Sequence, residues 1–247
     1  MKLILNGALG RMGRAVAVLA ADRGHEIVAG VDVAVGEAAF PVYTDWADCP
    51  KADAVIDFSN PAALEAELAY VTAHHLPLVL CTTGLSADQL AAVNKAAEVV
   101  PVFFSSNMSL GVAVLSALTK KAAAVLGDTF DIEIVEMHHN QKLDAPSGTA
   151  LMLADAAKAG LSYEPEYTYD RHSRRQKRDK KEIGIASLRG GTVVGEHSVY
   201  FAGEQEVITL SHSAGSRSVF AGGALTAAAF IADKAAGMYS MEDILNQ

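Results

Sequence analysis

The chain is poor in cysteine, in positive charge and in long apolar runs, and each shortage excludes a class of protein. Only two cysteines occur in 247 residues, too few for a disulfide framework or a zinc site. The net charge of −9 gives no general reason to expect nucleic acid. No apolar run reaches the roughly 20 residues that span a bilayer. The N-terminus resembles a signal peptide for only three residues before glycines interrupt it, so we predict a cytoplasmic protein that binds no membrane.

Apolar residues, by contrast, make up 51% of the chain, which excludes a disordered protein. A chain of 247 residues can bury a sizeable core as one large domain or as two modest ones. The pattern of apolar residues changes after Asn107, and this favours two domains.

A glycine-rich turn separates the first predicted strand, residues 2–5, from a helix predicted over 14–22. Strand, glycine turn and helix are the context that a dinucleotide-binding fingerprint requires. Gly7 permits a tight turn, Gly10 lets the backbone approach a pyrophosphate, and Gly13 lets helix and strand pack closely. The alternative is a turn that merely permits packing. Arg11 adds a cation where phosphates would lie.

Asp32 ends a second predicted strand, where the fingerprint expects an acid for the ribose hydroxyls of the adenosine. A strand-end or capping role is the alternative. No Arg or Lys follows at residues 33–35, and a carboxylate should repel a 2′-phosphate. The sequence therefore favours NADH, with NADPH open if Arg11 or a distant lysine compensates.

Strands and helices then alternate, which predicts an α/β fold with a doubly wound parallel sheet. Small polar residues follow two of the strands, namely Thr82, Thr83, Ser106 and Asn107. The carboxyl ends of parallel strands meet at one edge of a sheet, where such folds bind ligands. These residues suit a nicotinamide carboxamide or ribose, although each alone is more often a helix cap. The predicted strands cover 54–58, 78–81 and 102–104, and the helices cover 62–73 and 86–98.

The second half of the chain predicts an α+β domain with a mixed or antiparallel sheet. A long apolar helix is expected over 111–126, and residues 131–136 alternate as a half-buried strand does. Residues 217–224 lead into a last predicted helix, which runs through Ala235 and should return to the first domain. We therefore predict a discontinuous dinucleotide-binding domain, 1–108 and 217–247, and a substrate-binding and oligomerisation domain, 109–216. Further strands are predicted at 184–188, 192–201 and 206–212.

The stretch Glu136–Thr149 places protonatable groups directly before a predicted helix, residues 150–158. The free N–H groups and positive dipole at a helix N-terminus bind carboxylates and phosphates. Imidazole titrates nearest neutrality and suits general acid catalysis. We expect His138 or Lys142 to supply a proton, and Lys142 with the amides of Ser147–Thr149 to hold a substrate carboxylate.

Other interpretations of this stretch remain open. We expect Asp144 to be a cap or a lysine orienter and not a catalyst. We expect Glu136 to end a strand. Adjacent histidines point apart, so we predict no metal site. Ser147 lacks the elbow of a hydrolase nucleophile. The chain could instead be another amino-acid-pathway dehydrogenase, such as an aspartate or homoserine dehydrogenase, or an NAD(H)-sensing module without turnover.

A basic run, Arg171–Lys181, departs from the acidic average. A solvated loop or charged sheet edge is the simplest interpretation. A cationic wall that attracts a dianionic substrate is the alternative. The run has no interleaved aromatic residues, which argues against nucleic acid.

Over its whole length the chain resembles the 4-hydroxy-tetrahydrodipicolinate (dihydrodipicolinate) reductase family of lysine and diaminopimelate biosynthesis. The stretch Glu136–Ala150 matches the signature Glu-x-His-His-x3-Lys-x-Asp-x-Pro-Ser-Gly-Thr-Ala. Supporting matches occur at residues 7–14, 57–61, 82–84, 107–111, 195–197 and 216–217. The resemblance implies NAD(P)H-dependent reduction of the dicarboxylate and a homotetramer.

The resemblance also implies roles for single residues. His138 and Lys142 match catalytic positions. His139, Lys142, Gly148 and Thr149 match substrate-binding positions, with Ser147 beside them. Cys81 stands where the family usually has glycine. The matching cofactor positions are Gly7, Ala8, Leu9, Gly10, Arg11, Met12, Asp32, Cys81, Thr82, Thr83, Ser105, Ser106, Asn107 and Met108.

Overall fold

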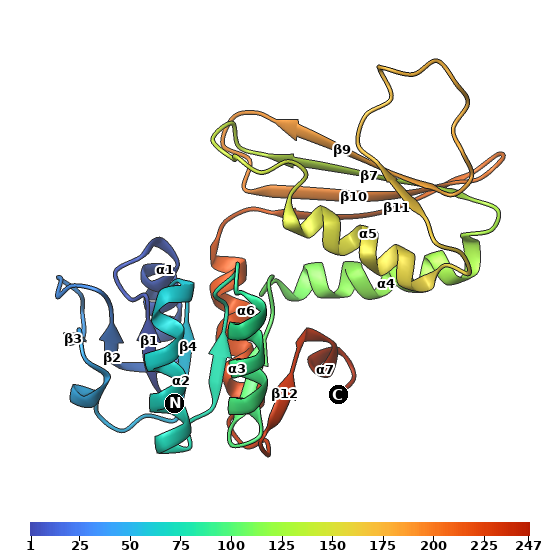
Figure 1. Ribbon diagram of the computed structural model, residues 1–247. Helices are drawn as coiled ribbons and strands as arrows, with labels where there is room; N and C mark the ends of the chain where they lie inside the picture. The colour runs from blue at the N-terminus through green and yellow to red at the C-terminus, as the bar shows by residue number, and fades with distance from the viewer. The chain divides into compact units, whose positions relative to one another are not determined.

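The computed structural model describes residues 1–247 and divides into two compact units (Figure 1). Unit 1 comprises Met1–Ser109 and Arg217–Gln247, and unit 2 comprises Leu110–Ser216. The first boundary lies one residue later than the sequence predicts. None of the helices is long and apolar enough to cross a membrane.

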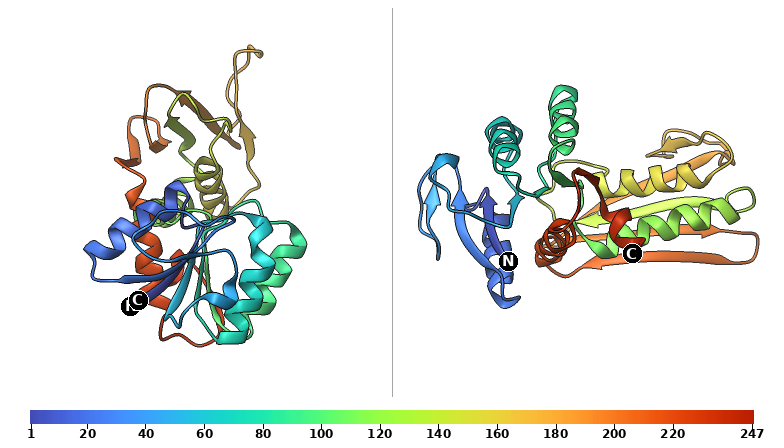
Figure 2. Two further views of the ribbon diagram at one scale, coloured as in Figure 1. Left: turned by 90° about the vertical axis from the view of Figure 1, so that its left-hand side faces the viewer. Right: turned by 90° about the horizontal axis from the view of Figure 1, so that it is seen from below.

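Unit 1 is built on a seven-stranded sheet in the order β12-β6-β5-β4-β1-β2-β3, with every neighbouring pair parallel. Helix α1 packs against α6 and α2 against α3, and Figure 2 shows the two pairs on opposite faces of the sheet. The predicted doubly wound fold is confirmed. The strands are β1 Lys2–Asn6, β2 Glu26–Val31, β3 Val42–Tyr43, β4 Ala54–Asp57, β5 Leu78–Leu80, β6 Pro101–Phe104 and β12 Gly237–Tyr239. The helices are α1 Arg11–Asp22, α2 Leu64–His74, α3 Ala87–Ala97, α6 Ser218–Ile231 and α7 Met241–Leu245, with short 3-10 turns at Trp46–Asp48 and Pro61–Ala63.

Three elements of unit 1 were not predicted: β3, β12 and α7. Each has five residues or fewer, too short for a hydrophobic period to show. Helix α6 ends at Ile231, four residues before the predicted end. Helix α1 begins at Arg11, because the last glycine of the turn already lies in its first turn.

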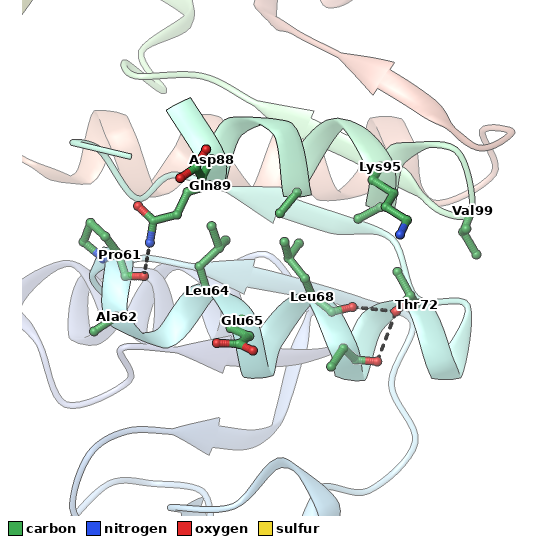
Figure 3. A pocket seen from close by; sticks show the side chains of 13 residues that line it. Pro61, Ala62, Leu64, Glu65, Leu68, Thr72, Asp88, Gln89, Lys95 and Val99 are labelled. Carbon is green, nitrogen blue, oxygen red and sulfur yellow. Dashed lines mark hydrogen bonds between the residues drawn. The ribbon is translucent and has the colours of Figure 1, made fainter. Parts of the chain in front are cut away.

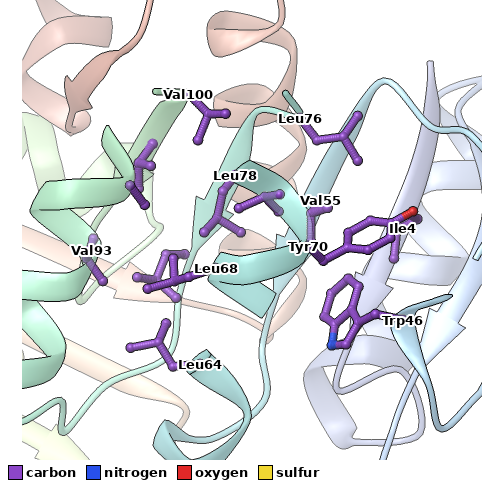
Figure 4. Close-up of a cluster of buried hydrophobic side chains, with 14 of the residues drawn as sticks. Ile4, Trp46, Val55, Leu64, Leu68, Tyr70, Leu76, Leu78, Val93 and Val100 are labelled. Atoms are coloured by element: carbon purple, nitrogen blue, oxygen red, sulfur yellow. The ribbon is translucent and has the colours of Figure 1, made fainter. Parts of the chain in front are cut away.

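One hydrophobic core of unit 1 lies between the sheet and α2 and α3 (Figure 4), and α6 buries a second set of apolar residues. Leu68 on α2 and Val93 on α3 belong to one buried cluster with Leu78 on β5. Trp46 packs on Tyr70 with ring centroids 5.0 Å apart. Burying a side chain of this size contributes about 1.5–3 kcal/mol. This packing holds the carboxyl ends of β1, β4 and β5 in register.

Unit 2 is built on a five-stranded mixed sheet in the order β11-β10-β7-β9-β8. β10 is antiparallel to β7 and β11, whereas β9 is parallel to β7 and β8. The two helices of the unit, α4 and α5, pack together against one face of the sheet, as Figure 1 shows. The predicted mixed sheet is confirmed. The elements are α4 Leu110–Leu126, β7 Asp131–His138, α5 Gly148–Gly160, β8 Glu166–Thr168, β9 Glu182–Arg189, β10 Gly195–Ala202 and β11 Val207–Ala214.

The basic run folds onto acidic side chains of the sheet in unit 2. Arg171 lies 2.8 Å from Glu133 and 3.1 Å from Glu182. Arg174 lies 2.6 Å from Glu182, which is 2% exposed, and Arg178 also pairs with Glu133. These arginines neutralise the acids of β7 and β9, so their charges are not free to form the cationic wall that was considered.

Candidate active site

The glycine turn between β1 and α1 has the geometry of a close-packed nucleotide turn. Gly7 has a φ of +74°, and a Cβ there would lie 2.6 Å from the carbonyl oxygen of Phe58. A Cβ on Gly13 would lie 2.3 Å from the carbonyl oxygen of Gly7. Real atoms do not approach so closely, so both positions require glycine, for the two reasons that the sequence suggested.

The N-terminus of α1 is open to an anion. Its N-cap, Gly10, supplies no side-chain hydrogen bond, and the first turn contains no acidic residue. Arg11, the first helical residue, is exposed. A cavity of about 510 Å³ lies beside the turn, and Gly7, Gly10 and Asp32 are among its lining residues. Uncapped amides, an adjacent cation and a cavity of this size fit the diphosphate and adenosine parts of a dinucleotide.

Asp32 follows β2 and is tied to the glycine turn. Its carboxylate accepts hydrogen bonds from the amide of Leu9, at 2.9 Å, and from the amide of Val33, at 2.8 Å. The side chain is half-buried beside the cavity. A carboxylate oxygen has more than one lone pair, so Asp32 retains acceptor capacity for hydroxyl groups.

The loops after β5 and β6 bury some of the predicted residues and expose others. Cys81 and Thr82 are buried, whereas Thr83 and Ser106 are exposed. After β6, the hydroxyl of Ser105 donates to the carbonyl oxygen of Asn107 at 2.8 Å. The side chains of Cys81, Thr82 and Met108 are buried, so these residues offer mainly backbone groups at this edge of the sheet.

A buried polar network begins at Asn6, the residue before the glycine turn. The amide of Asn6 donates to the Ser59 hydroxyl and to the Glu67 carboxyl group, both at 3.2 Å. Asp57 accepts from the amide of Ser59 at 2.8 Å. Burial raises the pKa of Asp57, and burial followed by the charge of Asp57 raises the pKa of Glu67. This network joins the end of β1 to the loop after β4 and to α2.

A groove of about 710 Å³ between α2 and α3 is not part of this site (Figure 3). Leu64, Leu68 and Val99 line it, and Gln89 closes one end by donating to the carbonyl oxygen of Pro61 at 2.7 Å. None of the predicted catalytic or binding residues lines this groove.

In unit 2, His138 is paired with a buried carboxylate. Strand β7 ends at His138, two residues later than predicted. Because side chains alternate along a strand, Glu136 and His138 point to the same face. Both are buried, and Nδ1 of His138 lies 2.6 Å from Oε2 of Glu136. Glu136 is therefore a partner of the predicted proton donor and not merely a strand end.

Glu136 is also the centre of a larger network. Arg189, at the end of β9, approaches both carboxylate oxygens with its two terminal nitrogens, each at 2.8 Å. The amide of Ser147 donates to Oε1 at 3.1 Å. Burial acts to raise the pKa of Glu136, but hydrogen bonds from Arg189, His138, Ser187 and the Ser147 amide outweigh it and lower the pKa to about 2. Glu136 is thus ionised at neutral pH.

The loop before α5 carries the predicted charges. Lys142 pairs with Asp144 at 2.9 Å, which agrees with Asp144 as a lysine orienter. The Lys142 amide donates to the carbonyl oxygen of His139 at 3.1 Å, and His139 is half-buried. Gly148 and Thr149 begin α5, where Gly148 is exposed and a Cβ on it would meet no other atom within 4 Å. The helix end is therefore accessible to an anion.

Ser147 is the N-cap of α5 and reaches across to β10. Its hydroxyl accepts from the amide of Ala150 at 3.1 Å and is hydrogen-bonded to Nε2 of His197 at 3.0 Å. The rings of His138 and His197 lie 5.1 Å apart, edge to face. Burial, followed by the charge of His138, lowers the pKa of His197 to about 4. His197 is therefore neutral near pH 7 and buttresses the site.

Sequence reasoning missed Arg189 as a site residue and placed Glu136 at a strand end. A prediction that extended the strand to His138 would have shown that Glu136 and His138 share a face, because residues two apart on a strand do so. No comparable signal pointed to Arg189, which lies 53 residues after Glu136 and reaches it only through the parallel pairing of β7 and β9.

Comparisons with known proteins cover the whole chain. The family models for the N-terminus and the C-terminus of dihydrodipicolinate reductase match residues 1–108 and 111–245. The 4-hydroxy-tetrahydrodipicolinate reductase of Caldanaerobacter subterraneus subsp. tengcongensis is 49% identical, over 100% of this chain and 99% of its own length. The enzyme of the same name from Zymomonas mobilis is 45% identical, over 99% of this chain and 97% of its own.

The fold agrees with these relatives. The dipicolinate-bound dihydrodipicolinate reductase from Paenisporosarcina sp. TG-14 superposes with a TM-score of 0.82, over 99% of both chains, at 24% identity. Three findings lead to the same assignment. Both family models match, two relatives are 45–49% identical, and the signature around His138 is present. The chain belongs to the dihydrodipicolinate reductase family.

Proposed function

We propose that the chain reduces 4-hydroxy-tetrahydrodipicolinate to tetrahydrodipicolinate with NAD(P)H, as an oxidoreductase of lysine and diaminopimelate biosynthesis. The observation that carries the proposal is the pairing of His138 with an ionised Glu136, beside the first residue of α5, the exposed Gly148. This arrangement joins a proton donor to a carboxylate-binding site, and a reductase of a dicarboxylate needs both.

When bound, the nicotinamide supplies a hydride to a carbon of the unsaturated ring. Unit 1 would hold the cofactor through the turn Gly7–Met12, Asp32 and the loops at 81–83 and 105–108. Lys142 and the amides of Gly148 and Thr149 bind a substrate carboxylate, and His139 contributes to substrate binding. The Ser147 amide, which the sequence predicts as a substrate contact, donates to Glu136 instead. His138 delivers the proton that the ring requires as negative charge builds on it. Such general acid catalysis is worth roughly 10²- to 10⁴-fold in rate.

The test is substrate-dependent oxidation of reduced nicotinamide, followed by absorbance, with wild type, His138→Ala and Lys142→Ala. Both variants should lose turnover severely while NADH affinity stays near normal, since neither residue lies on the cofactor turn. His172→Ala is the matched control, because His172 is an exposed histidine of the same unit that pairs with Asp170. Wild type that binds NADH without turnover would instead support the sensing module.

For the cofactor, we expect NADH to serve at least as well as NADPH. Asp32 faces the cavity beside the turn, and no cation follows it at Val33 or Val35. Comparison of kcat/KM for the two cofactors tests this, and a strong preference for NADPH would contradict it. Because the proposed reaction consumes NAD(P)H, we also expect the protein to act in the cytoplasm.

The open face of the sheet in unit 2 supports a homotetramer. Both helices of the unit lie on the other face, and Val207 and Leu188 remain 59% and 49% exposed. Apolar side chains on an uncovered sheet face are typical of subunit interfaces. Light scattering should give the mass of four chains, and the mass of one chain would contradict the proposal.

A further inference from the structure

We infer that Glu136 and Arg189 are positioning residues that hold His138 in one tautomer, with the proton for the substrate on Nε2, and that Gly195 leaves this nitrogen uncovered. The inference deepens the proposed function and rests on it. It concerns residues for which the family signature suggested no catalytic part, and it assigns each a separate physical task.

Glu136 determines which nitrogen of His138 can act. A carboxylate ionised at neutral pH only accepts hydrogen bonds, so Nδ1 of His138, 2.6 Å away, must carry a hydrogen. The transferable proton is then the one on Nε2. After transfer, the ring is neutral and still donates from Nδ1 to Glu136, and a solvent proton restores Nε2.

Arg189 makes it possible to bury this carboxylate. Glu136 is fully buried, and an unpaired buried charge costs several kcal/mol. The guanidinium contacts both oxygens at 2.8 Å, and it also donates to the carbonyl oxygen of Asp144 at 2.7 Å. With the amide of Ser147, each oxygen of Glu136 receives two hydrogen bonds. The carboxylate therefore cannot rotate without breaking several contacts, and the loop that carries Lys142 is anchored to it.

Gly195, the first residue of β10, explains why Nε2 stays accessible. A Cβ at this position would lie 3.1 Å from Nε2 of His138 and 3.5 Å from Cδ2. A side chain at residue 195 would therefore fill the space beside Nε2 of His138. Gly195 has no unusual φ, so alanine would be tolerated by the backbone and would act through this contact alone.

Several other titratable groups face His138 and its neighbours. They are Arg189 on β9, His197 on β10, His212 on β11, and Lys142 and Asp144 on the loop before α5. Burial lowers the pKa of both His197 and His212, so both are neutral near pH 7. Glu136 is therefore the acceptor that directs His138, and Arg189 balances its charge.

Two variants of Glu136 separate orientation from charge. Glu136→Gln keeps an acceptor for Nδ1 and removes the negative charge, whereas Glu136→Ala removes both. Labelled-histidine ¹⁵N spectra should show the Nδ1-protonated tautomer of His138 in wild type and in Glu136→Gln, and a mixture in Glu136→Ala. We expect kcat to fall by roughly 10²-fold in Glu136→Gln and further in Glu136→Ala, with NADH affinity unchanged. The pH profile of kcat should shift in both.

Gly195→Ala and Glu204→Gln complete the set. Gly195→Ala keeps the network and should lower kcat by about tenfold without changing the tautomer, since it only crowds Nε2. Glu204 is the control, because it is an exposed glutamate in the turn between β10 and β11 and contacts none of these residues. Glu204→Gln should keep full activity.

The outcomes distinguish this inference from the proposed function. Wild type without substrate-dependent turnover would refute the function. Active wild type with His138 protonated on Nε2 and bare at Nδ1 would overturn the inference alone. Full activity in Gly195→Ala and Glu136→Gln would also overturn it, even if Glu136→Ala fails to fold.

Discussion

In unit 1, the buried carboxyl groups of Asp57 and Glu67 receive hydrogen bonds from neutral donors, the Ser59 amide and the Asn6 side chain. In unit 2, the buried Glu136 and Glu182 lie against arginines. Burial raises the pKa of the first two groups, whereas the partners of Glu136 lower its pKa to about 2. In unit 1 burial therefore acts against ionisation of these acids, whereas in unit 2 hydrogen bonds keep the central carboxylate charged.

The difference suits the role that we propose for each unit. A raised pKa for acids near the turn Gly7–Gly13 acts against negative charge where we propose that the phosphates of a dinucleotide bind. Beside His138, a permanent carboxylate is useful, because it orders the tautomer of the imidazole. A buried glutamate thus has a raised pKa at Glu67, where no arginine is bound, and a lowered pKa at Glu136, where Arg189 is bound.

The largest expected effect comes from removing the arginine. Arg189→Met leaves Glu136 buried without its cation and should lower the free energy of unfolding at neutral pH by about 3 kcal/mol. The midpoint of urea unfolding measures this. Arg175→Met, an exposed arginine of the basic run, is the control and should change the midpoint little. Equal midpoints for the two variants would contradict the contrast between the units.

Acid should remove the same stabilisation in wild type. The folded pKa of Glu136, about 2, lies below its ordinary value of 4.5, so its contribution is present above pH 4.5 and is lost as the pH falls towards 2. Glu136→Gln should unfold with a weaker dependence on pH in this range. An unchanged acid unfolding profile would show that Glu136 is not the ionised centre.

A smaller contrast concerns the serines that cap helices in the two units. Ser147→Ala removes a buried cap and leaves Nε2 of His197 without its partner, so we expect a loss of about 2 kcal/mol. Ser86→Ala removes an exposed capping box on α3 and should cost about 1 kcal/mol. Thermal unfolding compares the two. A greater loss of stability for Ser86→Ala than for Ser147→Ala would mean that the hydrogen bond between Ser147 and His197 does not stabilise the protein.

Glu67→Gln should have a smaller effect of opposite sign. A carboxyl group whose folded pKa is raised above 4.5 destabilises the protein increasingly as the pH rises from 4.5 towards the folded pKa. Replacement by glutamine removes this penalty, so the variant should be at least as stable as wild type at alkaline pH and unchanged below pH 4.5. Strong destabilisation by glutamine at alkaline pH would show that Glu67 is ionised and paired.

The smallest effect is expected at the Lys142–Asp144 pair. Asp144 is 60% exposed, and exposed ion pairs contribute about 0–1 kcal/mol. Asp144→Asn should therefore leave the unfolding midpoint nearly unchanged while altering KM for the dicarboxylate, through the freed Lys142. A change in stability as large as that of Arg189→Met would contradict the distinction between buried and exposed pairs.

By itself, the sequence determined the doubly wound unit, the mixed sheet, the glycine turn and the stretch around His138. These depend on local periodicity, on glycine spacing and on helix-end chemistry, all of which act between near neighbours in the chain. The signature around His138 was specific enough to indicate the family. Elements of five residues or fewer, such as β3 and β12, carried too little pattern to be found.

Only the tertiary structure decided how the charged groups pair. Arg189 meets Glu136 across 53 residues and Ser147 meets His197 across 50, through strand pairings that no local pattern encodes. Three arginines of the basic run, Arg171, Arg174 and Arg178, likewise pair with Glu133 and Glu182 on the sheet of the same unit. Hydrogen bonds and ion pairs act over a few ångströms in space, so their partners are set by the register of β7, β9 and β10.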